Sequence, residues 1–187
     1  MKQGFFWLLV LVAALLPLGY GRMLPEPPDP EDAALPPADW ETAQVEPEVH
    51  LDQVITALGE ELGIAVPKVV DEESLPAVFG IQPDQLASYY GVYSAISTSP
   101  DTYLAVRPQT GEEAAVKEAL QARPEQLAQL YDGWLPQQEE KARAGQVFSC
   151  GECLVLVIGG RQTQDPQQEM QRAGEILGQF WQETPPQ

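Results

Sequence analysis

The chain has 187 residues, 44% of them hydrophobic, which is enough for one domain of ordinary size with a buried core. It carries 28 acidic against 10 basic side chains, which gives a formal net charge of −18 at pH 7. Because a surface this negative repels phosphate backbones, and because no cluster of Lys and Arg offsets it, the sequence excludes nucleic acid as a class of partner.

The first 21 residues have the form of a signal peptide or an N-terminal anchor. Met1 and Lys2 precede an uncharged, apolar run over residues 5–18. A helix of that run would be roughly 21 Å long, which is shorter than the ~30 Å hydrocarbon core of a bilayer. Gly19 and Gly21 supply the small residues of a cleavage site after Gly21. We therefore expect an extracytoplasmic protein, either secreted or anchored to the cytoplasmic membrane by residues 5–18.

Residues 22–48 form a linker rich in Pro and acidic side chains. Proline favours the extended polyproline II conformation, and repulsion between like charges extends the chain further. We expect this segment to be disordered and to hold a single domain, residues 49–187, away from the membrane.

The domain is predicted to begin with a helix and a strand pair. Gly63 is expected as the C-cap residue of the helix. The apolar side chains before it recur at helical spacing: Leu51, Val54, Ile55, Leu58 and Leu62. A short helical turn follows near Pro83 and Asp84 and carries Leu86. Two strands are expected at residues 89–97 and 102–107, separated by the turn residues 99–101.

The second half of the domain repeats this order with a longer helix. Thr110 and Glu113 have the spacing of a capping box, and Pro124 is expected to kink or restart the helix that follows. The apolar stripe of that helix consists of Val116, Leu120, Leu127, Leu130, Tyr131 and Trp134. Strands are predicted at residues 146–150 and 153–158, and Asp165 before Pro166 marks the start of a last helix. Its apolar face consists of Met170, Ala173, Ile176, Leu177, Phe180 and Trp181.

The order of elements predicts the fold class. An N-terminal helix is followed by two strand–strand–helix (ββα) units. This order favours an α+β fold in which a four-stranded antiparallel sheet has its helices packed on one face.

Four segments resemble a known bacterial family in their order and pattern of hydrophobic and turn residues. They are Val78-Phe79-Gly80-Ile81, Tyr103-Leu104-Ala105-Val106, Tyr131-Asp132-Gly133-Trp134-Leu135-Pro136 and Leu154-Val155-Leu156-Val157-Ile158. Over residues 54–178 the chain resembles the domain of unknown function 4358 family, found mostly in exported proteins of Gram-positive bacteria. The resemblance implies an extracytoplasmic location and brings no active site to carry over. Members often carry a lipid-modified cysteine, which this sequence lacks after its apolar run.

Cys150 and Cys153 are the only two cysteines, and their spacing is that of a C-x-x-C motif. A redox-active C-x-x-C motif lies at a helix N-terminus, where the helix dipole lowers the thiol pKa. Here a strand pattern follows, so Gly151 and Glu152 are predicted to form a two-residue hairpin turn. The cysteines would then face each other with Cα atoms about 5.5 Å apart, within disulfide range. We expect a structural disulfide, and a thiol–disulfide redox module is the alternative.

The remaining residues indicate neither catalysis nor a cofactor. His50 is the only histidine, so neither a Ser-His-Asp or Cys-His arrangement nor a zinc site is expected. The sequence favours a non-catalytic binding or scaffolding domain at the bacterial cell envelope, with an envelope protein or wall component as its partner. An enzyme that acts on a wall or peptide substrate through paired carboxylates is a weaker alternative.

Overall fold

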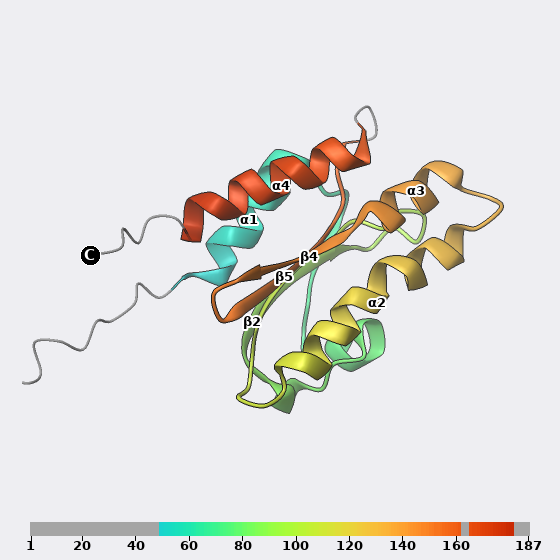
Figure 1. Ribbon diagram of the computed structural model, residues 1–187. Coiled ribbons are helices and arrows are strands. Elements are labelled where there is room, and N and C mark those ends of the chain that lie inside the picture. The colour runs from blue at the N-terminus through green and yellow to red at the C-terminus, as the bar shows by residue number, and fades with distance from the viewer. Residues whose placement is uncertain (1–48, 162–164, 182–187) are drawn as a thin grey trace, which may run out of the picture. The chain divides into compact units, whose positions relative to one another are not determined.

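The computed structural model of the protein describes residues 49–161 and 165–181 (Figure 1). The predicted signal segment, residues 1–21, and the predicted linker, residues 22–48, lie outside these residues. In the described part of the chain, no helix has both the length and the apolar character needed to cross a membrane.

The described residues form one five-stranded antiparallel sheet, not the predicted four-stranded one. The strands are β1 (Pro67–Val69), β2 (Leu86–Ser94), β3 (Thr102–Pro108), β4 (Gln146–Cys150) and β5 (Cys153–Ile158), in the order β1-β2-β3-β5-β4. The strand missing from the prediction, β1, is three residues long and begins with a proline, so it has no periodicity to detect. It pairs only with β2 and forms one edge of the sheet, where a proline is tolerated.

The central strand, β3, and its neighbour β5 carry apolar side chains on both faces. On β3, Tyr103 and Ala105 contribute to one core, whereas Leu104 and Val106 contribute to the other, and all four are fully buried. The side chains of β5 are buried on both faces in the same alternating way. A strand that is apolar at every position must be covered twice, because its side chains point alternately to opposite faces.

Helices accordingly cover both faces of the sheet, so the prediction of helices on one face was wrong (Figure 1). The helices α1 (Leu51–Leu62) and α4 (Pro166–Trp181) pack side by side on one face. The helix α2 (Glu113–Tyr131) packs on the opposite face, with the short helix α3 (Pro136–Ala144) following it. Two short helical turns, η2 (Leu75–Phe79) and η3 (Pro83–Gln85), contribute to the link between β1 and β2.

The helix ends confirm some sequence predictions and correct others. The carboxylate of Asp165 accepts a hydrogen bond from the N–H of Gln167 at 3.0 Å, so it caps α4 as expected. The capping box at Thr110 does not form, because the carboxylate of Glu113 instead accepts from the N–H of Gly111. At Pro124, α2 does not restart but continues as one helix.

The end of α2 was also predicted wrongly. Leu130 and Trp134 were placed on the apolar stripe, yet they are 63% and 57% exposed. The helix ends at Tyr131, and Gly133 with a φ of 77° turns the chain before Trp134. The indole N–H of Trp134 donates to the carbonyl of Leu130 at 2.6 Å, so the two residues form an exposed, locally ordered corner.

Candidate functional site

Three adjoining cavities surround α3 at one end of the sheet. The first, of about 390 Å³, lies between the end of α1, the β2–β3 loop and α3. The second, of about 200 Å³, lies between α3 and the first turn of α4, and it shares Gln138, Lys141, Gly160 and Arg161 with the first. The third, of about 380 Å³, lies on the other side of α3 and shares Glu140 and Pro166 with the second.

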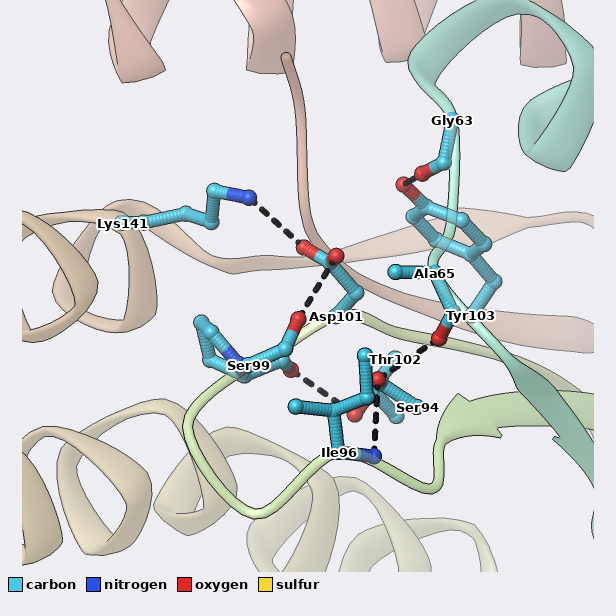
Figure 2. A network of polar contacts seen from close by, with 10 residues as sticks. Gly63, Ala65, Ser94, Ile96, Ser99, Asp101, Thr102, Tyr103 and Lys141 are labelled. Atoms are coloured by element: carbon cyan, nitrogen blue, oxygen red, sulfur yellow. Dashed lines mark hydrogen bonds and ion pairs between the residues drawn. The ribbon is translucent and has the colours of Figure 1, made fainter. Parts of the chain in front are cut away.

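A buried ion pair lies in the wall of the largest cavity. Lys141 Nζ donates to Asp101 Oδ1 at 2.8 Å, and the two side chains are only 10% and 9% exposed (Figure 2). The hydroxyl of Ser99 donates to the second carboxylate oxygen of Asp101 at 2.8 Å. The pair therefore fixes the β2–β3 loop to α3 at a point where both charged groups are largely shielded from bulk water.

Backbone and hydroxyl groups around the ion pair hold the loop in place. The N–H of Ser94 donates to the carbonyl of Asp101 at 2.9 Å, and the hydroxyl of Ser94 donates to the carbonyl of Ala65 at 2.7 Å (Figure 2). The buried phenol of Tyr103 donates to the carbonyl of Gly63 at 2.6 Å. Burial raises the pKa of Tyr103 well above its usual range, so the phenol remains a hydrogen-bond donor at neutral pH.

Gly159 and Gly160 allow the chain after β5 to approach this cluster closely. A Cβ atom at Gly159 would lie 2.2 Å from the phenol oxygen of Tyr103. At Gly160, where φ is 125°, a Cβ atom would lie 2.7 Å from Cγ of Glu169. Any side chain larger than hydrogen at either position would therefore clash with its neighbours.

Glu169 occupies the first turn of α4 and lines the smaller cavity. The residue is 2% exposed, and its Oε2 atom has no hydrogen-bond partner among the described residues. Gln138, on α3, lines the same cavity, and its Oε1 atom is also buried without a partner in the described part of the chain. Both oxygens are inaccessible to solvent, so they lie behind the surface of the cavity that their residues line.

The predicted cysteine pair lies at the opposite end of β5 from these cavities. Cys150 and Cys153 are directly opposed across the β4–β5 hairpin, and Gly151 in the turn has a φ of 58°, as the sequence predicted. Burial, together with a smaller contribution from the neighbouring Cys153, raises the pKa of the Cys150 thiol to about 11. Both thiols are free in this structure, so the disulfide is not observed and stays a prediction.

His50 is exposed at the start of α1. Its backbone carbonyl accepts from the N–H groups of Gln53 and Val54, while its side chain makes no capping hydrogen bond. Across residues 49–161 and 165–181, no group of three His, Cys, Asp or Glu side chains is placed to hold a metal ion.

Sequence reasoning missed the residues that build the cavities. Asp101 was interpreted only as a turn residue, and α3 was not predicted, because its buried positions are Lys141, Ala142 and Ala144, which form no apolar stripe. Glu169 has the position of an ordinary acidic residue in a first helical turn. No local sequence pattern marks Lys141 as a buried residue, so the structure alone reveals its role.

The sequence model of the family described as Domain of unknown function (DUF4358) matches residues 63–159, which is more than half of the chain. The match confirms the resemblance noted in the sequence. Asp101, Tyr103 and Lys141 lie inside the matched segment, whereas Glu169 lies outside it. No curated protein and no solved structure matches the chain.

We predict that Lys141→Met lowers the free energy of unfolding by about 3–5 kcal/mol, because it leaves the carboxylate of Asp101 buried without its counter-ion. Arg143→Met is the matched control, since Arg143 on the same helix makes ion pairs with Glu125 and Glu139 while 52% exposed. That change should cost about 0–1 kcal/mol. Urea denaturation measures both.

The double variant Lys141→Met/Asp101→Asn should regain part of the stability that Lys141→Met loses, because it removes the unpaired charge. Equal losses for Lys141→Met and Arg143→Met would contradict the structural role of the buried pair.

We also predict that Cys150 of the reduced protein stays protonated at neutral pH and titrates near pH 11, because its thiolate would be poorly solvated. Ultraviolet absorbance of the thiolate measures this, and the Cys150→Ser variant assigns the transition. A thiol pKa below the unperturbed value of ~8.5 would favour the redox alternative.

Proposed function

Because the chain belongs to the DUF4358 family, which is defined by a domain of unknown function, we propose a role from the physical features of the domain itself. It is a non-catalytic, extracytoplasmic binding or scaffolding domain at the bacterial cell envelope. Its binding site is the group of cavities around α3, and its partner is an envelope protein or a wall component.

The observation that carries this proposal is the construction of the largest cavity, whose wall contains the Asp101–Lys141 ion pair. Its volume of about 390 Å³ falls in the range of roughly 300–1,000 Å³ that is usual for ligand sites. Burying two charges costs desolvation free energy, and an apolar pair of similar volume would often be as stable. The ion pair is therefore better explained by the polar, fixed wall that it gives the cavity than by stability alone.

The chemistry of the described residues supports binding over catalysis. The one histidine is exposed at the start of α1, and it makes no side-chain cap. The thiol of Cys150, with its pKa raised to about 11, is a poor nucleophile at neutral pH, and it lies at the far end of β5 from the cavities. In the described part of the chain, Lys141 donates to Asp101, so its ammonium group serves the architecture of the wall.

The location is supported by the amino-terminal sequence. Met1, Lys2 and the apolar run over residues 5–18 have the form of an export signal. The acidic and Pro-rich residues 22–48 suit a spacer between the membrane and a domain exposed to solvent.

We predict that residues 1–48 export a fused reporter enzyme that is active only outside the cytoplasm, because they contain the signal and its spacer. Reporter activity in whole cells measures export. The control replaces Leu9 and Val12 with Asp, which interrupts the apolar run and should abolish activity. A silent wild-type fusion that accumulates in the cytoplasm would refute the proposed location.

We further predict that a photo-crosslinking amino acid at Gln137 forms an adduct in intact cells, because this exposed residue lines the cavity next to α3. Gln121, an exposed glutamine of α2 that lines none of these cavities, is the matched control. Mass spectrometry of the purified protein identifies the adduct. The same adduct at both positions, or none at Gln137, would count against binding at this site.

A further inference from the structure

The two edges of the sheet differ in how strongly they resist pairing with another chain. The strand β1, at one edge, is three residues long, begins with Pro67 and carries Lys68. Short length, proline and lysine are the features by which natural sheets keep edge strands from pairing. The strand β4, at the other edge, has five residues and contains neither a proline nor a charged side chain. The edge formed by β4 is therefore the one open to a further strand.

The register of the β4–β5 hairpin shows which backbone groups of β4 face outwards. Cys150 and Cys153 flank the two-residue turn, and the pair that closes such a turn exchanges hydrogen bonds. Because hydrogen-bonded and non-hydrogen-bonded pairs alternate, Phe148 also bonds to β5, whereas Val147 and Ser149 direct their N–H and C=O groups away from it. No described strand pairs with that side of β4, so the backbone groups of both residues lack a strand partner there.

The side chains of β4 are accessible enough to take part in an interface. Ser149 is exposed, and Val147 and Phe148 are partly exposed. The helices α2 and α4 contact β4 from opposite faces of the sheet (Figure 1). Val147 packs against the core on the α2 side, whereas Phe148 packs against the core on the α4 side. An added strand would therefore extend the hydrogen-bond ladder and place its side chains beside apolar groups on both faces.

Symmetry makes a second copy of β4 a complementary strand for this edge. When Phe148 lies opposite Phe148 of the second copy in an antiparallel pair, Val147 of each copy lies opposite Ser149 of the other. Each of these two pairs exchanges two hydrogen bonds, which satisfies all the outward backbone groups of Val147 and Ser149. No like charges face each other along the paired strands, although each chain has a net charge of −18.

Opposite charges come together where the paired strands end. The same register places the turn residue Glu152 of one copy opposite Ala144 of the other, next to Arg143. Gly145, between α3 and β4, has a φ of −55° and a ψ of 143°, so the backbone is still extended at this point. Glu152 and Arg143 are both exposed. The symmetric pair thus brings an acidic turn to the basic last turn of α3 twice, which favours a second copy as the partner.

We propose that the chain forms a symmetric dimer in which the β4 strands of two copies pair antiparallel, with Phe148 at the two-fold axis. The two five-stranded sheets then form one continuous sheet. A contact of this kind uses the same surface on both copies, so the assembly closes at two. The inference goes beyond the proposed binding function, because it needs no ligand in the cavities around α3.

The Val147→Pro variant tests the hydrogen bonds of the interface. The N–H of Val147 faces away from β5, so proline removes a donor from the dimer and none from the hairpin. Val69→Pro is the matched control at the other edge. The N–H of Val70 donates to the carbonyl of Gly91 at 2.9 Å, so the N–H of Val69 points out of the sheet in the same way.

Sedimentation equilibrium of the full-length protein in a nonionic detergent, over a series of protein concentrations, measures the dimer dissociation constant. The constant should rise at least about 10-fold for Val147→Pro and change by no more than about threefold for Val69→Pro. Association through residues 5–18 cannot produce this difference, because all three proteins contain them. Equal effects of the two prolines would overturn the proposal. A wild-type protein that is monomeric at every concentration would also overturn it, and would leave the edge to a strand from another source.

A disulfide across the two-fold axis tests the register without introducing a proline. Residues opposite each other in a non-hydrogen-bonded pair have Cα atoms about 4.5 Å apart, which a disulfide can span. In a Cys150→Ser/Cys153→Ser background, Phe148→Cys should give covalent dimers on mild oxidation, as measured on non-reducing gels. Val69→Cys is the control, since Val69 is 52% exposed on the other edge strand, and it should stay monomeric on those gels. Covalent dimers at Val69, or none at Phe148, would overturn the proposed pairing.

Discussion

The burial of β3 and β5 on both faces is the constraint on which the rest of the structure depends. Leu104 and Val106 need a cover on one side, while Tyr103 and Ala105 need one on the other. Two layers of helices are therefore required, and α1 with α4 and α2 with α3 supply them. At one end of the sheet, polar groups of the connecting segments form the cluster around Asp101 and Lys141.

The cavities follow from this arrangement. Thr102 at the start of β3 is paired with Ile158 at the end of β5, so the segments that precede and follow these strands emerge together. Asp101 comes from one segment and Gly159 from the other. The C-terminal end of α1 and the helix α3 form the other walls of the cavity of about 390 Å³. The buried ion pair joins the β2–β3 loop to α3.

Local patterns were sufficient for much of the fold and for little of the candidate site. The ranges of α1, β4 and β5 follow from apolar spacing, Gly63 and the turn at Gly151, all of which are local. The face that each helix covers is a tertiary property, and helices on one face were predicted. An unbroken apolar run such as that of β5 is typical of a strand covered on both faces. Asp101 and Lys141 lie 40 positions apart, and neither has an unusual neighbour in sequence, so only the folded chain brings them together.

The β3–β5 pairing also has a consequence for how the chain reaches this structure. The β2–β3 and β4–β5 hairpins are local and can form early, but joining them requires closure of the long segment that contains α2 and α3. That closure is the step with the largest entropic barrier in the assembly of the sheet. The cavity of about 390 Å³ is lined by the β2–β3 loop and by Gly160 and Arg161, which follow β5, so it does not exist in a partly folded chain in which the two hairpins are still apart.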